Sequence, residues 1–363
     1  MVPQLPPGVS VMGESPAKIM VVGVGGGGGN AVSRMAQAGL VGVELVAMNT
    51  DAQVLEIVEA HRRLQLGSKR TGGLGAGGDP EVGREAAEES RDEIADLLEG
   101  LDMVFITAGM GGGTGTGGAP VVAEIAKEMG ILTVGIVTRP FSFEGLARSQ
   151  RAERGVQQLA KNVDAIITIS NDRLLKVAPH EMPLTRAFEL VDEILHQGVQ
   201  GVTELITVPG LINLDFADVE AVLKGAGTAL MGIGEADGEN KTREAARKSI
   251  SSPLLDFSVK GAKKAILNIT GGEDLTLEEV TAAASAIQEA LSDKADLIFG
   301  AAIREGMQKA KVTVIATGFP AGQGGEIMEA NEEIVLERLE REGIRDDYDI
   351  PTFLRRSRRP EIP

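Results

Sequence analysis

The glycine-rich segment at residues 109–118, GMGGGTGTGG, constrains the fold of this chain more than any other stretch. Seven of its ten residues are glycine, and none carries a charge. It follows an apolar run at 103–107, which predicts a buried strand, and precedes residues 119–126, which predict a helix with a proline near its first turn. In such a strand–loop–helix unit, backbone N–H groups and the helix N-terminus face an anion. We therefore predict that this segment binds phosphate.

The composition of the 363-residue chain excludes several classes of protein. A formal net charge of −17 argues against nucleic acid as a partner and against binding to a bare anionic membrane surface. Without cysteine, the chain has no disulfide, no thiol chemistry and no zinc–thiolate site. No apolar run approaches the roughly 20 residues of a membrane span, and residues 1–16 do not read as a secretory signal. We expect a cytoplasmic protein with no direct membrane span.

Short apolar runs alternate with helical patterns over the first half of the chain. Residues 18–24, 43–48, 64–66, 102–107, 131–138 and 164–170 predict strands, and residues 31–38 and 81–98 predict helices. This alternation predicts an α/β fold with a Rossmann-like parallel sheet covered by helices on both faces. Ligands bind at the carboxyl ends of such strands, and the glycine clusters at 23–30, 71–80 and 109–118 all follow a predicted strand.

The second half of the chain predicts a long central helix followed by a smaller α+β domain. Apolar residues recur at three- and four-residue steps from Leu184 to Ile206, and Gly198 and Gly201 indicate that packing between two domains holds this helix. Strands are expected at 228–234, 263–270, 296–303 and 311–317, and helices at 239–250 and 276–291. Four divisions are predicted up to residue 320: a flexible leader at 1–16, an α/β domain at 17–182, the central helix at 183–208 and the α+β domain at 209–320. A linker at 321–348 and a tail at 349–363 follow. Residues 326–342 of the linker can form a charged helix.

The first glycine cluster leaves two readings open. Residues 23–28, GVGGGG, satisfy the G-x-G-x-x-G fingerprint and can bind a dinucleotide or another phosphate ligand, or can form a plain strand–helix turn. With Asp51 as the acidic residue after the second strand, this loop would suit an NAD-dependent oxidoreductase, which needs no second phosphate loop.

The segment at 109–118 has no lysine, and the chain contains no G-x-x-x-x-G-K-[ST] sequence. Backbone N–H groups, a helix dipole and a metal ion must therefore neutralise the phosphates.

The signature at residues 111–117, GGGTGTG, is similar to that of the tubulin/FtsZ family, and the motifs around it resemble the FtsZ branch. The resembling segments are VGGGGGNAV at 24–32, NTD at 49–51, TRPFSFEG at 138–145, NDR at 171–173, QGVQG at 197–201, NLDFADV at 213–219, NITGG at 268–272, VIATGF at 314–319 and DIPTFLR at 349–355. The resemblance covers about residues 17–320 and the tail. It implies a self-assembling cytoskeletal GTPase that forms head-to-tail filaments and a ring at the division site, in the cytoplasm at mid-cell.

The resemblance also implies that the chain binds GTP or GDP with Mg²⁺, so residues 17–182 would be a GTP-binding domain. The residues implied to line the phosphates are Gly26, Gly27, Gly28, Gly29, Asn30, Gly77, Gly78, Gly112, Gly113, Thr114, Gly115 and Thr116. Glu144 would take the ribose hydroxyls, and Arg148 would lie beside the nucleotide. Asn171 and Asp192 would bind the guanine edge, whose O6 accepts a hydrogen bond while N1 and N2 donate. Gly72 stands where the family has an arginine, and no side chain is assigned as a metal ligand.

The catalytic residues implied by the resemblance are Asn213, Asp215 and Asp218. From the residues alone, the two aspartates favour helix caps before a helix at 219–223. In the family, this loop of one subunit enters the nucleotide site of the next, where its carboxylates position and polarise the attacking water. Hydrolysis would then depend on assembly of a homopolymer.

The tail at Asp349–Arg355 resembles the family's recruiting peptide for membrane-linked division proteins. Its apolar residues on an otherwise polar end favour recognition by a partner over an inert end. Two other functions remain open. One is a tubulin-like scaffold without turnover, against which Asp215 and Asp218 both argue. The other is the NAD-dependent oxidoreductase, against which the second phosphate loop argues.

Overall fold

The computed structural model describes residues 17–175, 182–207, 211–212, 214–252, 255, 258–292 and 294–319. The expectations for the leader at 1–16, the linker at 321–348 with its charged helix, the tail at 349–363 and Asn213 lie outside the described residues. Within these described ranges, no helix is both long enough and apolar enough to cross a membrane.

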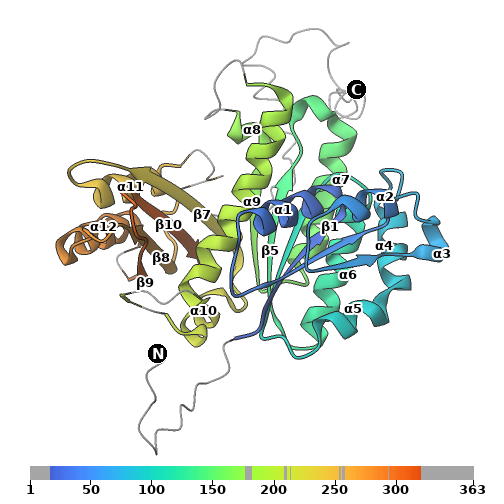
Figure 1. Ribbon diagram of the computed structural model, residues 1–363, viewed down its shortest axis with the longest axis horizontal. Helices are drawn as coiled ribbons and strands as arrows, with labels where there is room; N and C mark the ends of the chain where they lie inside the picture. The colour runs from blue at the N-terminus through green and yellow to red at the C-terminus, as the bar shows by residue number, and fades with distance from the viewer. Residues whose placement is uncertain are drawn as a thin grey trace, which may run out of the picture. The chain divides into compact units, whose positions relative to one another are not determined.

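The first half of the chain forms a parallel sheet in the order β3-β2-β1-β4-β5-β6 (Figure 1). Its strands are β1 (Ile19–Val24), β2 (Glu44–Asn49), β3 (Arg62–Gln65), β4 (Met103–Gly109), β5 (Leu132–Arg139) and β6 (Ala165–Ser170). Its helices are α1 (Gly25–Gln37), α2 (Ala52–Ile57), α3 (Ser68–Thr71), α4 (Pro80–Glu89), α5 (Arg91–Leu98), α6 (Thr114–Glu128), α7 (Leu146–Ala160) and α8 (Asn171–Leu174), with a 3₁₀ turn at Ser142–Glu144. Each neighbouring pair of strands is parallel, which confirms the predicted Rossmann-like sheet.

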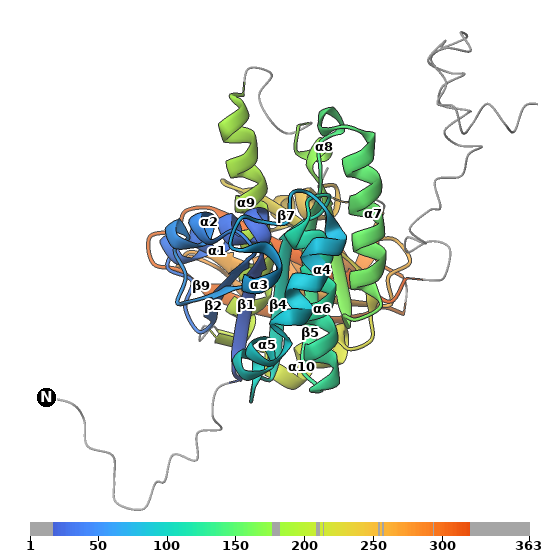
Figure 2. The ribbon, with the colours of Figure 1, turned by 90° about the vertical axis from the view of Figure 1, so that its right-hand side faces the viewer.

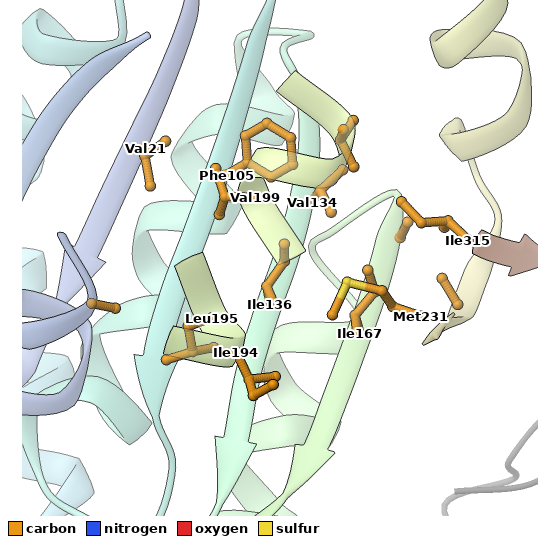
Figure 3. Close-up of a cluster of buried hydrophobic side chains, with 14 of the residues drawn as sticks. Val21, Phe105, Val134, Ile136, Ile167, Ile194, Leu195, Val199, Met231 and Ile315 are labelled. Atoms are coloured by element: carbon orange, nitrogen blue, oxygen red, sulfur yellow. The ribbon is translucent and has the colours of Figure 1, made fainter. Parts of the chain in front are cut away.

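One hydrophobic core lies between this sheet and the helices α1 and α9 (Leu184–Thr207). Figure 3 shows Val21, Phe105 and Val134 of β1, β4 and β5 in the same cluster as Leu195 and Val199 of α9. In Figure 2, α1 and α9 lie on one side of the strands, and α6 and α7 lie on the other. The sheet is therefore covered on both faces, as its nearly continuous apolar strands predict.

The rest of the described chain extends the same sheet. After α10 (Phe216–Leu223), the strands β7 (Gly227–Ala236), β8 (Lys264–Gly271), β9 (Asp296–Ile303) and β10 (Ala310–Thr317) follow, with α11 (Lys241–Ile250) and α12 (Leu277–Ala290) between them. The start of β7 pairs in parallel with β6, and the rest of β7 pairs antiparallel with β10. The predicted smaller α+β fold is confirmed. The periodicity of the sequence does not reveal that the strands of this domain pair with the edge of the first sheet.

The helix α9 runs unbroken through Gly198 and Gly201, and both glycines lie against neighbouring strands. A β-carbon on Gly198 would lie 3.2 Å from the Met231 sulfur, and one on Gly201 would lie 2.8 Å from the Thr313 side chain. Met231 belongs to β7 and Thr313 to β10, while α9 also packs against β5. Packing against both halves of the sheet therefore holds this helix, as predicted.

Three predicted helix boundaries are wrong. The helix α1 starts at Gly25 instead of 31, and α6 starts at Thr114 instead of 119, so Pro120 lies inside α6 rather than in its first turn. Both glycine loops therefore supply the first turn of a helix, despite the low helix propensity of glycine. The predicted helix at 81–98 is two helices, α4 and α5, separated at Ser90. The Ser90 hydroxyl accepts a hydrogen bond from the Gly67 N–H at 3.1 Å, which holds the break in place.

Candidate active site

Three glycine loops, which we call the first (24–30), second (72–79) and third (109–115) loop, meet at the carboxyl edge of the sheet. A β-carbon on Gly25 would lie 2.8 Å from the Gly115 nitrogen, and one on Gly115 would lie 3.1 Å from the Val24 carbonyl oxygen. The first and third loops therefore touch backbone to backbone, at a distance that only glycine permits.

The second loop packs against the third loop. A β-carbon on Gly113 would lie 3.0 Å from the Asp79 nitrogen. Thr50, just beyond the end of β2, contacts both loops: its hydroxyl lies 2.6 Å from the Thr114 hydroxyl, and its carbonyl accepts a hydrogen bond from the Gly75 N–H at 3.2 Å. The three glycine clusters of the sequence therefore form one continuous surface.

Gly26 and Gly112 show that this surface has room for a ligand. Among the glycines that the structure describes, only these two combine an ordinary φ with no atom within 4 Å of an added β-carbon. Neither backbone strain nor a neighbour in the chain requires glycine at these positions. A ligand that lies directly against the backbone does require it, so the surface fits a polyphosphate.

The surface is positively polarised by backbone rather than by side chains. The helices α1 and α6 both begin within the glycine loops, and neither has an acidic residue in its first turn. Each helix N-terminus leaves about four N–H groups without a helical acceptor and carries roughly half a positive charge. The Thr116 hydroxyl accepts a hydrogen bond from the Gly111 N–H at 2.8 Å and so fixes the start of α6. The arrangement can bind phosphate through N–H groups and helix dipoles.

Glu144 and Arg148 lie together beside the third loop. Glu144 ends the 3₁₀ turn: its Oε1 accepts from the Phe141 N–H at 2.8 Å, and its Oε2 lies 3.1 Å from the Arg148 Nε. A β-carbon on Gly111 would come within 2.8 Å of the Arg148 Cγ, which places this arginine against the loop. The two residues are thus positioned at the edge of the open surface.

Asn171 and Asp192 lie on α8 and α9, which pack against each other. Asn171 is 5% exposed, and among the residues that the structure describes its Oδ1 has no hydrogen-bond partner. Burial raises the pKa of Asp192 to about 7, although the nearby charge of Arg34 opposes this shift. A buried amide with a free acceptor and a half-buried carboxyl group are groups that a polar ligand would satisfy.

Asp215 and Asp218 cap the start of α10. The Asp215 Oδ1 accepts from the Asp218 N–H at 2.8 Å, and the Asp218 Oδ2 accepts from the Asp215 N–H at 3.4 Å. This is the helix cap that the residues alone favour, and it leaves Asp215 exposed. The helix α10 follows the C-terminal end of α9, whereas α8 lies near the other end (Figure 1). The stretch of α9 from Asp192 to Thr207 is about 22 Å long. The structure therefore does not bring these aspartates to the glycine loops of the same molecule.

Two arginines lie near these groups, and no sequence pattern indicates a role for either of them at the site. Arg34, on α1, donates to the Glu189 carbonyl oxygen on α9 at 3.3 Å, one turn from Asp192. Arg151, on α7, donates to the Gly78 carbonyl oxygen in the second loop at 2.5 Å. Each contact joins segments far apart in the chain, and a lone arginine on a helix forms no recognisable pattern.

Comparison with known proteins agrees with this geometry. The family described as "Tubulin/FtsZ family, GTPase domain" matches residues 18–179, and the "FtsZ family, C-terminal domain" matches residues 227–320. A solved FtsZ dimer from M. jannaschii, described as empty, is 46% identical with a TM-score of 0.81, over 84% of this chain and 89% of that chain. A tryptophan-to-tyrosine mutant of M. jannaschii FtsZ gives the same identity and TM-score over 84% of this chain and 92% of its own. CetZ2 from Haloferax volcanii, at 22% identity, a TM-score of 0.74 and coverage of 89% and 99%, shares the fold.

The fold and the site therefore define a GTPase of the tubulin type, which binds GTP and GDP and hydrolyses GTP. Within that class, the chain belongs to the FtsZ family. The fold class, the GTPase activity and the guanine nucleotide expected from the sequence are confirmed. The alternative of an NAD-dependent oxidoreductase does not fit this family.

Proposed function

We propose that this chain assembles head to tail into filaments and that GTP is hydrolysed where two subunits meet. The observation that carries the proposal is the separation of the glycine loops from Asp215 and Asp218, which lie beyond the far end of α9. In a head-to-tail filament, that end of one molecule meets the nucleotide end of the next, so one repeated contact would complete every site. The dimer described for the M. jannaschii relative supports self-association.

Each subunit would bind the nucleotide with residues of its own. The proposed phosphate ligands are the N–H groups of Gly26–Asn30, Gly77, Gly78 and Gly112–Thr116. Glu144 would bind the ribose, Arg148 would lie beside the nucleotide, and Asn171 and Asp192 would bind the guanine edge. Mg²⁺ on the phosphates would neutralise part of their charge. The described ranges contain no group of three or more His, Asp or Glu residues suited to a metal, so the phosphate oxygens would be its main ligands.

The chemistry of hydrolysis would divide between two subunits. The N-termini of α1 and α6 would stabilise the negative charge that develops on the phosphate oxygens as the bond to GDP breaks. Asp215 and Asp218 of the next subunit would hold the attacking water and accept its proton. Asn213, which lies outside the described residues, is proposed to help position that water.

The proposed cellular role is a division ring at mid-cell, in the cytoplasm. Membership of the FtsZ family supports this role. The tail at Asp349–Arg355, outside the described part of the chain, is proposed to bind membrane-linked division proteins. The competing function is a tubulin-like scaffold without turnover, and the presence of both Asp215 and Asp218 argues against it.

Phosphate release measured across protein concentrations tests the shared site. We expect almost no release below a threshold concentration, because an isolated subunit lacks the aspartates of a neighbour. Above the threshold, release should rise in proportion to the protein that pellets with GTP. Release proportional to total protein at all concentrations would contradict a site shared between subunits. Pelleting with GTP but without release would favour the scaffold.

The raised pKa of Asp192 makes nucleotide binding depend on pH. Guanine N1 and N2 donate hydrogen bonds to the ionised carboxylate, so binding favours the deprotonated form. With a pKa of about 7 in the free protein, GDP affinity should fall about tenfold from pH 8 to pH 6. The stability of the nucleotide-free protein should change in the opposite sense and decrease as pH rises through 7, because the carboxyl group ionises more easily when unfolded.

The Asp192→Asn variant should remove both of these pH dependences. GDP titrations and thermal unfolding at pH 6, 7 and 8 measure them. A wild-type GDP affinity that stays constant over this range would show that Asp192 does not bind guanine as a carboxylate.

A further inference from the structure

An arginine on α7 holds the second loop at the carbonyl of Gly78. The Arg151 Nη1 donates to the Gly78 carbonyl oxygen at 2.5 Å, between residues that are 73 positions apart. The side chain is partly buried, and among the residues that the structure describes its Nε has no hydrogen-bond partner. A hydrogen bond from a charged donor is stronger than one between neutral groups. The bond from Arg151 therefore restricts the position of the Gly78 carbonyl group in this loop.

The attached segment is a tight turn whose flanking residues Ala76 and Asp79 pack against Gly113, whereas its two central glycines have few contacts. The Asp79 N–H donates to the Ala76 carbonyl oxygen at 3.0 Å, and Gly77 and Gly78 between them have φ of 58° and 78°. Two central residues at positive φ are what a type I′ turn requires, and glycine adopts this conformation without being confined to it. A β-carbon on Gly77 would meet no atom within 4 Å, so packing does not fix that residue. Packing therefore fixes the ends of the turn more than its centre, and a contact at the Gly78 carbonyl restricts the centre.

We propose that Arg151 is a positioning residue of the nucleotide site, which holds this turn so that its N–H groups stay directed at the phosphates. A peptide group is planar, so fixing the Gly78 carbonyl also fixes the N–H of Asp79 that closes the turn. The N–H groups of Gly77 and Gly78 have no acceptor within the described ranges, and they are available to a ligand. The inference rests on the proposed function, in which these two glycines line the phosphates.

The helix α7 also provides a matched control. Arg154 is exposed, lies about one turn beyond Arg151, and lines the same cavity of about 590 Å³ between α4, α6 and α7. No hydrogen bond or ion pair joins Arg154 to any residue that the structure describes. Replacing either arginine with alanine removes one positive charge from the same helix. Only the replacement of Arg151 removes the bond to Gly78.

The test compares Arg151→Ala, Arg151→Lys and Arg154→Ala in the full chain. GDP affinity should fall about tenfold in Arg151→Ala, which corresponds to one charge-assisted hydrogen bond. The KM for GTP should rise by a similar factor, while kcat above the assembly threshold stays within about twofold, because Arg151 does not touch the reacting atoms. Amide hydrogen exchange of residues 72–79 should become faster in the nucleotide-free Arg151→Ala protein. Arg151→Lys should restore most of the affinity, and Arg154→Ala should match the wild type.

Two outcomes would overturn the inference, and a third would count against the proposed function instead. Unchanged exchange of residues 72–79 in Arg151→Ala would show that the arginine does not hold the loop. An equal loss of affinity in Arg154→Ala would show that the helix acts only through its charge. Faster exchange of the loop with wild-type GDP affinity would show that Gly77 and Gly78 do not line the phosphates.

Discussion

Replacement of Asp215 by asparagine is expected to lower GTP turnover by at least ~100-fold, while GDP affinity and pelleting with GTP stay at the wild-type level. An amide cannot accept the proton of the attacking water, and a positioned general base contributes about 10²–10⁴-fold to a rate. The nucleotide contacts proposed above come from the glycine loops and from α8 and α9. The substitution should therefore affect hydrolysis and leave binding and assembly unchanged. Asp218→Asn is expected to act in the same direction.

Asparagine is the informative substitution because it preserves the helix cap. The Asp215 Oδ1 accepts a hydrogen bond from the Asp218 N–H at 2.8 Å, and an asparagine side-chain oxygen caps a helix equally well. Alanine would remove the cap and cost about 1 kcal/mol of stability. A loss of turnover in Asp215→Ala could then arise from a displaced loop. The asparagine variant separates the role of the carboxylate in catalysis from its role in folding.

Glu220→Gln is the matched control for this experiment. It removes a carboxylate from the same helix, but one that is paired with the Lys224 Nζ at 2.7 Å. Because exposed pairs contribute little to stability, turnover should stay within about twofold of the wild type. Phosphate release and the pelleted fraction are measured in the same samples, well above the assembly threshold. Full GTPase activity in Asp215→Asn would remove the proposed role, and so would an equal loss in Glu220→Gln.

The strands and the glycine loops were predictable because their signals are local. Residues 103–107 and 131–138 are almost entirely apolar, as strands buried on both faces tend to be, and they form most of β4 and β5. The lack of lysine in the third loop indicated binding through backbone N–H groups, and the structure places the start of α6 in this loop, next to the open position at Gly112. The choice of guanine came from family resemblance, because no local pattern around Asn171 selects a base.

The helix starts and the long-range contacts were not predictable from local patterns. A glycine costs about 1 kcal/mol of helix stability relative to alanine, so the glycine runs read as loops. In the fold the same glycines allow close packing: a β-carbon on Gly28 would lie 2.4 Å from the Thr107 carbonyl oxygen. The pKa of Asp192 depends on burial, and the bond from Arg151 to Gly78 spans 73 residues. No short window of sequence contains either of these causes.

Gly112→Ala is expected to weaken GDP binding by up to ~100-fold and to leave the nucleotide-free protein as stable as the wild type. The added β-carbon would meet no atom within 4 Å, and φ at this position is ordinary, so the folded chain can accommodate it. If the phosphates lie against this backbone, the methyl group occupies space that they need, and overpacking of this kind costs about 1–3 kcal/mol. Gly26→Ala should behave in the same way for the same reason.

Gly130→Ala should show the opposite pattern, because it lies just beyond the other end of α6. Its φ is 74° and its surroundings are open, so alanine there is strained without touching any neighbour. We expect a loss of about 1 kcal/mol of folding stability and no change in GDP affinity. GDP titration and thermal unfolding of the nucleotide-free variants measure both quantities. Wild-type affinity in Gly112→Ala would show that the phosphates do not approach this backbone. Destabilisation in Gly112→Ala would show that the fold itself requires the glycine. Weaker GDP binding in Gly112→Ala, together with lower stability in Gly130→Ala, would show that Gly112 is required by the ligand and Gly130 by a turn.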